Sequence, residues 1–121
     1  MYGPRGKIAV EQQIDIEMTA GSDDLEQSRY KEAETRYRSA LRLNEDLGAR
    51  LARHDWHTAH PSTEILVGLA DSLLGQRRYS EAEEVLGQGA ALERKLGNPV
   101  RAKELLARAN AIRVHTARQG P

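Results

Sequence analysis

A stretch that occurs twice constrains the fold of this chain more than any other feature. The segment QSRYKEAETRYRSALRLNEDLG (27–48) aligns without gaps on QRRYSEAEEVLGQGAALERKLG (76–97), 49 residues further along. A glutamine, the pairs Arg-Tyr and Leu-Gly, and the triplet Glu-Ala-Glu coincide. Repetition at a fixed spacing is typical of folds that stack one supersecondary unit on another. We therefore expect two related structural units.

Each copy has the apolar spacing of an amphipathic helix. Small or apolar residues recur every three or four positions, which places them on one helix face. In the first copy these residues are Tyr30, Ala33, Tyr37, Ala40, Leu43 and Leu47, and in the second they are Tyr79, Ala82, Leu86, Gly89, Leu92 and Leu96. Gly48 and Gly97 follow the last apolar residue of each run, where a glycine can end a helix in the left-handed conformation.

A further helix is expected before each copy. The segment TEILVGLADSLLGQ (63–76) has a broad apolar face and begins after Pro61, a typical residue at a helix start. Its counterpart IDIEMTAGSDDLEQ (14–27) has a narrower apolar stripe and could be broken near Gly21. Because apolar residues alternate over residues 8–18, a strand is the alternative there.

Together these segments predict an all-α fold made of antiparallel helix-turn-helix pairs. Alanine, leucine, arginine and glutamate are the most frequent residues, and all are strong helix formers. The expected parts are an N-terminal extension (1–12), a divergent first repeat with an extended second helix (13–53), a linker (54–62), a second repeat (63–97), a closing helix (100–117) and a tail (118–121).

The second unit resembles a tetratricopeptide repeat, and in particular the longer repeats of kinesin light chains. The residues that carry the resemblance are His60-Pro61, Leu66, Leu69-Ala70, Leu73, Tyr79, the Glu81-Ala82-Glu83 triplet, Leu86 and Leu96-Gly97. The first copy matches well only over residues 25–48, and ARLARHDWHTA is inserted after it. The resemblance implies a short right-handed solenoid that binds other proteins on the face formed by the first helix of each pair.

On that resemblance, the binding face draws on three helices. Its residues are Met18 and Leu25 in the first, Glu64, Val67, Asp71 and Leu74 in the second, and Arg101 and Arg108 in the closing helix. This lining is partly apolar and partly acidic. It lacks the Lys/Asn pair with which chaperone-binding relatives hold a terminal carboxylate, since Asp71 stands where Asn is expected. The alternative is that these are ordinary solvated positions.

The segment HDWHTAHP (54–61) holds three of the four histidines and the single tryptophan. His54, His57 and His60 could bind a metal, which is the alternative function we consider. On a helix, however, His60 would lie far from the other two, and the chain has no cysteine to complete a site. A linker between the units is the favoured interpretation. Trp56 is either buried there or an anchor for a partner.

Charge and motifs narrow the function classes. The 18 basic and 18 acidic residues balance, which argues against nucleic-acid binding through a surplus of positive charge. No apolar run is long enough to span a membrane, and the first residues do not resemble a signal peptide. The HExxH, GxSxG and phosphate-loop motifs are absent, so we expect neither catalysis nor a cofactor. A cytoplasmic location is expected, and the kinesin resemblance adds the cytoskeleton.

The balanced total hides an uneven distribution of charge. Residues 11–34 hold eight acidic and two basic side chains, whereas residues 94–118 hold seven basic and one acidic. Opposite charges at the two ends could steer separate partners, or copies of the chain joined head to tail. A single repeat cannot bury its own apolar face. We therefore predict a protein partner or a second copy, with the chain acting as an adaptor or as a small structural subunit.

Overall fold

The computed structural model describes residues 3–51 and 62–119 and contains five helices within them. These are α1 (Gly3–Glu26), α2 (Tyr30–Leu51), α3 (Ser62–Gly75), α4 (Tyr79–Lys95) and α5 (Pro99–Gln119). No strand occurs in these two ranges. The prediction of an all-α chain is confirmed.

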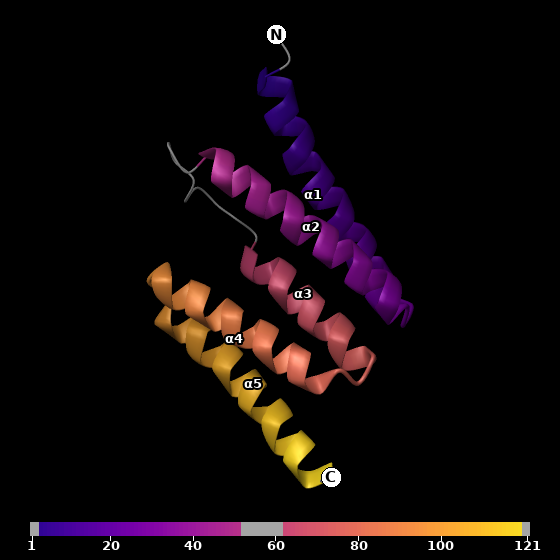
Figure 1. The fold of residues 1–121 in the computed structure, drawn as a ribbon, viewed down its shortest axis with the longest axis vertical. Helices are drawn as coiled ribbons and strands as arrows, with labels where there is room; N and C mark the ends of the chain where they lie inside the picture. Colours follow the sequence, from indigo (N-terminus) through magenta and orange to yellow (C-terminus); the bar gives the residue numbers. More distant parts are fainter. Residues whose placement is uncertain (1–2, 52–61, 120–121) are drawn as a thin grey trace.

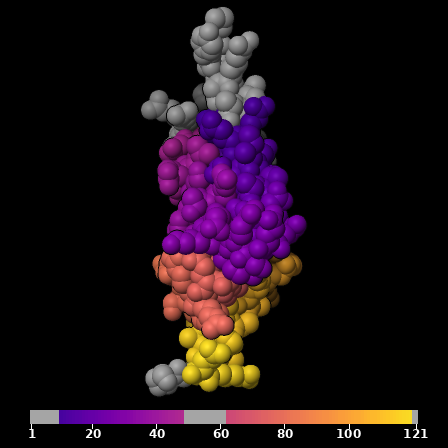
Figure 2. Space-filling model, turned by 90° about the vertical axis from the view of Figure 1, so that its right-hand side faces the viewer, coloured from indigo at the N-terminus to yellow at the C-terminus, as the bar shows by residue number. Residues whose placement is uncertain are grey.

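The five helices form an elongated stack in chain order. Each helix packs against the next, and α1 also contacts α3. Figure 1 shows α1, α3 and α5 running in one direction and α2 and α4 returning between them. Figure 2 shows α1 and α2 at one end of the molecule and the C-terminal part of α5 at the other. The helices are therefore arranged as two antiparallel pairs followed by a closing helix.

Three of the connections are the same tight turn. The backbone N–H groups of Arg29, Arg78 and Asn98 donate to carbonyl oxygens five residues earlier, at 2.8–2.9 Å. The residue before each donor, Ser28, Arg77 and Gly97 respectively, has a positive φ of 60°, 61° and 83°. Both features define a Schellman turn, which satisfies the last carbonyls of a helix. The prediction for Gly97 is confirmed, but non-glycine residues fill this position after α1 and α3.

Several boundaries differ from expectation at the N-terminal end. Helix α1 starts at Gly3, so most of the predicted extension (1–12) is helical, and the strand alternative for residues 8–18 is wrong. The helix is also unbroken at Gly21. Helix α2 continues past Gly48 to Leu51. Gly48, where a helix could have ended, lies inside α2, and the alanine, arginine and leucine that follow it are good helix formers.

The core contains most positions of the predicted stripes, whereas Tyr30, Leu43, Tyr79 and Leu92 are only half-buried. Its residues are Ile14, Ala33, Tyr37, Ala40, Leu47, Ile65, Leu69, Ala70, Leu73, Ala82, Leu86, Ala90, Ala102, Leu105, Ala109 and Ile112. Leu96 was expected among them but is 44% exposed, because it lies beyond the end of α4 at its C-cap.

Tyr37 joins three helices at the centre of this core. Its ring, which is 5% exposed, lies between Gly21 of α1 and Gly68 of α3. A Cβ atom added at Gly68 would be 2.2 Å from the ring, and one added at Gly21 would be 2.7 Å from it. Only glycine leaves enough room for an aromatic side chain to pass between these helices. Tyr37 thus links the first helical pair to the second.

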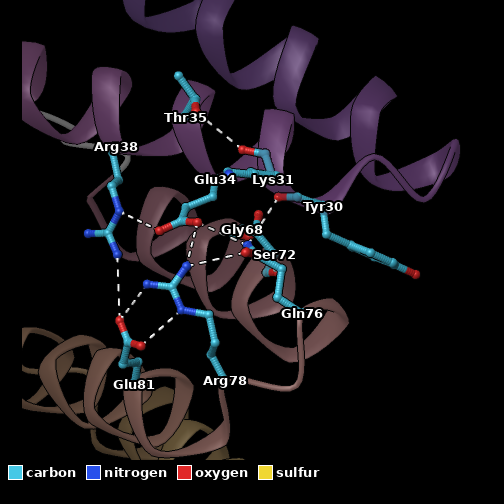
Figure 3. Close-up of polar contacts among 10 residues, drawn as sticks. All are labelled: Tyr30, Lys31, Glu34, Thr35, Arg38, Gly68, Ser72, Gln76, Arg78 and Glu81. Atoms are coloured by element: carbon cyan, nitrogen blue, oxygen red, sulfur yellow. Dashed lines mark hydrogen bonds and ion pairs between the residues drawn. The ribbon is translucent and has the colours of Figure 1, made fainter.

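A polar cluster holds α2 against the start of α4 (Figure 3). Glu34 accepts hydrogen bonds from Gln76 Nε2 at 2.9 Å, from Arg78 Nη1 at 2.7 Å and from Arg38 Nε at 2.8 Å. Arg78 also donates to both carboxylate oxygens of Glu81, at 2.9 and 2.7 Å. Burial raises the pKa of Glu34, but its hydrogen bonds to Gln76 and Arg38 and the charges of Arg78 and Arg38 outweigh this, so the pKa lies below its ordinary value.

The contacts between α2 and α3 recur between α4 and α5. Glu34 of α2 binds Gln76 just after α3, and Glu83 of α4 binds Arg113 of α5 at 2.9 Å. Glu83 lies 49 residues after Glu34, and Arg113 lies 37 residues after Gln76. The two junctions therefore share a polar contact at equivalent positions.

A second pair of contacts lies at the starts of α3 and α5. Asn44 Nδ2 donates to Ser62 Oγ at 2.6 Å, and Asn98 Nδ2 donates to Glu93 Oε1 at 3.0 Å. Glu93 lies 49 residues after Asn44 and also accepts a hydrogen bond from Thr63. In each case a buried polar residue of the even-numbered helix fixes the start of the helix that follows.

Candidate functional site

The structure places the predicted binding residues on α1, α3 and α5, the three helices that run in the same direction. We call this surface the odd-helix face, made of Met18, Leu25, Glu64, Val67, Asp71, Leu74, Arg101 and Arg108. Its four apolar side chains are half-buried and pack against the core. They are therefore fixed in place while part of each surface stays accessible to a partner.

The four charged residues of the face form two ion pairs that the sequence analysis did not anticipate. Arg108 Nη2 lies 2.7 Å from Asp71 Oδ1, and Arg101 Nη2 lies 3.4 Å from Glu64 Oε1. In each helix the two charged residues are two turns apart, so α3 and α5 are in register. Both pairs are substantially exposed, which limits each to about 0–1 kcal/mol of stability. Their main consequence is that neither arginine is an uncompensated cation.

Tyr37 lies behind the same face. Burial raises the pKa of its hydroxyl group, and the negative charge of Asp71 raises it further. The phenol therefore stays protonated at neutral pH. The buried Tyr37 hydroxyl group is therefore close enough to Asp71 of the odd-helix face to interact with its charge.

Residues 10–48 and 62–119 contain no group of three or more His, Asp or Glu side chains placed to hold a metal ion. Within the described part of the chain, no helix is both long enough and apolar enough to cross a bilayer. The weak metal candidates His54, His57 and His60, and the partner candidate Trp56, lie outside the described residues.

Two surface grooves were missed by the sequence analysis. The larger, which we call the α4/α5 groove, has a volume of about 440 Å³ and lies between Glu83, Glu84 and Gly87 of α4 and Leu106, Asn110 and Arg113 of α5. The smaller, of about 270 Å³, lies between α1 and α2 beside Ile16 and Leu43. The α4/α5 groove could have been found by aligning the sequence of α5 with that of α3. That alignment has an offset of 37 residues, so a search for repeats 49 residues apart does not reveal it.

Comparison with known proteins adds no relative. None of the protein-family models, curated proteins or solved structures that were compared with the chain matches it.

Proposed function

We propose that the chain is a non-catalytic protein-binding module, acting as an adaptor or as a small subunit of a larger assembly. The observation that carries the proposal is the odd-helix face. Met18, Leu25, Val67 and Leu74 are anchored in the core but remain partly accessible. A pre-formed apolar surface of this kind binds a partner with little loss of side-chain freedom.

The repeated junctions support a tetratricopeptide-like solenoid as the scaffold. In such arrays, each unit contacts its neighbours through the same surfaces, and the first helices line one side. The matching contacts of Glu34 with Gln76 and of Glu83 with Arg113 follow this principle. The resemblance to kinesin-light-chain repeats bears on the scaffold only, because a fold does not identify a partner or a cellular location.

The charges on the face indicate what kind of partner fits. Beside the apolar residues, Asp15 exposes a carboxylate, whereas Glu64 and Asp71 are already paired with Arg101 and Arg108. A segment with apolar side chains and additional basic residues would complement this surface. We therefore expect an amphipathic, basic segment of a partner protein.

Affinity purification with a matched pair of variants tests this function. Val67→Lys places a charge in the centre of the odd-helix face, and Gln88→Lys makes the same change at an exposed residue of α4. We expect a stoichiometric partner to be recovered with the wild-type chain and with Gln88→Lys but lost with Val67→Lys. The proposal is refuted if no co-purifying protein depends on Val67.

The metal alternative requires a separate measurement. Elemental analysis of the chain purified without a histidine tag should show no stoichiometric zinc, copper or iron. A bound metal that is lost when His54, His57 and His60 are replaced together would favour the alternative function.

A further inference from the structure

The α4/α5 groove corresponds to the surface on which α4 itself packs one unit earlier. Offsets of 49 residues from α2 to α4 and of 37 residues from α3 to α5 relate the two junctions. Leu106 and Asn110, which line the groove, lie 37 residues after Leu69 and Leu73 of α3 and therefore correspond to them. Those two leucines lie in the core together with Ala82 and Leu86 of α4. The groove therefore has the geometry of a binding site for one more helix.

The side chains of α4 show what such a helix presents. Before the helix, Arg78 reaches Glu34, and Ala82 and Leu86 then enter the core. The same spacing occurs on the exposed side of α5, where Lys103 is followed by Ala107 and Ala111. A shift of 25 residues superposes the two patterns. Small side chains at these positions permit close approach of two helices.

We propose that the α4/α5 groove binds α5 of a second copy, so that the chain forms a two-fold symmetric dimer. Because α4 runs antiparallel to α3, the incoming helix runs antiparallel to α5, as a two-fold axis requires. Ala107 of each copy then faces Asn110 of the other. The interface is a four-helix arrangement of two α4 and two α5 helices.

Charge complementarity supports this occupant. In the dimer, Lys103 of the second copy takes the place of Arg78 and reaches Glu83, which corresponds to Glu34. The antiparallel register also brings Glu104 opposite Arg113 of the other copy. These two side chains are 58% and 68% exposed and can reorient toward a partner. The symmetry forms each of these two contacts twice.

The exposed apolar residues of α5 provide the variant that tests the dimer. Leu106 is 36% exposed and Ile16, at the opposite end of the stack, is 62% exposed. We expect sedimentation velocity to show a concentration-dependent dimer for the wild type. Leu106→Asp should weaken dimerisation at least about tenfold with an unchanged helical circular-dichroism spectrum. Ile16→Asp, the matched control, should have no effect.

Cysteine cross-linking tests the register independently of any loss of stability. The chain has no cysteine, so two tagged single-cysteine variants, Ala107→Cys and Asn110→Cys, can be mixed and oxidised without competing disulfides. We expect a mixed disulfide-linked dimer, and none when Thr19→Cys replaces either variant. A chain that stays monomeric at high concentration would overturn the proposal. So would a dimer that depends on Ile16 and not on Leu106, since that result places the interface at α1.

This dimer does not depend on the proposed function. The Leu106→Asp monomer keeps the odd-helix face intact, so binding of a partner through Val67 can be measured on it. Absence of the dimer would be seen in sedimentation velocity, whereas absence of partner binding at the odd-helix face would be seen in affinity purification. The two proposals are therefore tested separately.

Discussion

The contact between Gly68 and Tyr37 makes the packing of the two helical pairs directly testable. In Gly68→Ala, the new methyl group would lie 2.2 Å from Tyr37 Cε1 and 2.3 Å from Cζ. Carbon atoms in van der Waals contact are about 3.5–4.0 Å apart, so the ring would have to move by more than an ångström. Gly21 blocks this movement on the opposite side of the ring. The methyl group can be accommodated only by separating α1 or α3 from α2.

The cost follows from two opposing effects. Overpacking a core typically destabilises a protein by about 1–3 kcal/mol. Replacing glycine by alanine within a helix returns about 1 kcal/mol through backbone entropy. Because the ring is confined on both sides, we expect overpacking near the upper end of its range. Gly68→Ala should therefore lower the free energy of unfolding by about 2 kcal/mol, which corresponds to a decrease in Tm of about 5–10 °C.

Urea and thermal unfolding measure this effect. Gly87→Ala is the matched control, since a Cβ atom at Gly87 would have no neighbour within 4 Å. At low protein concentration this control should gain up to about 1 kcal/mol. In a Tyr37→Leu background, Gly68→Ala should no longer destabilise the chain. The reasoning is wrong if Gly68→Ala is as stable as the wild type when Tyr37 is present.

Three further changes test other parts of the structure. Glu34→Gln should cost about 1–3 kcal/mol at neutral pH. Folding lowers the pKa of Glu34, so the stability that its carboxylate contributes is complete above the unfolded pKa of about 4.3. This stability is lost as the pH falls through the pKa of the folded state. The free energies of unfolding of wild type and variant, measured by urea titration, should therefore converge in acid. Thr63→Val removes the buried hydrogen bond to Glu93 and should lower stability by about 1–2 kcal/mol in the same assay, whereas a cost near zero would contradict this role. Arg77→Gly relieves a positive φ of 61° and should raise Tm, while a decrease would show that the turn is not strained.

The elements that were predicted correctly are those whose signals are local in the sequence. The spacing of Ala33, Tyr37 and Ala40 placed one helix face in the core, and that of Ala82 and Leu86 did the same for the second copy. The duplicated Glu-Ala-Glu triplet indicated that these faces belong to paired helices. Periodicity is informative here because burial on one side of a helix imposes it.

The features that were missed depend on contacts between distant residues. Nothing near Tyr37 in the sequence shows that Gly68, on another helix, makes room for its ring. Ser28 and Arg77 adopt the left-handed conformation because the Schellman turn requires it there, against their intrinsic preference.

The candidate face was predicted as a set of positions but not as a set of interactions. The resemblance placed Glu64, Asp71, Arg101 and Arg108 on one surface, and the structure does bring them together. The exact pairing of Asp71 with Arg108 depends on the register of α3 and α5, which is set by the intervening helix. The α4/α5 groove was missed because it depends on how α4 packs against α5.

Site-specific photo-cross-linking is the most direct test of whether the odd-helix face binds a protein. A photoreactive amino acid would be placed at Val67 or Leu74 on the face, and at Gln88 on α4 as the control, in the organism that makes the chain. We predict that both positions on the face cross-link to the same partner protein, and that position 88 does not. Equal cross-linking at all three positions, or none on the face, would contradict the account.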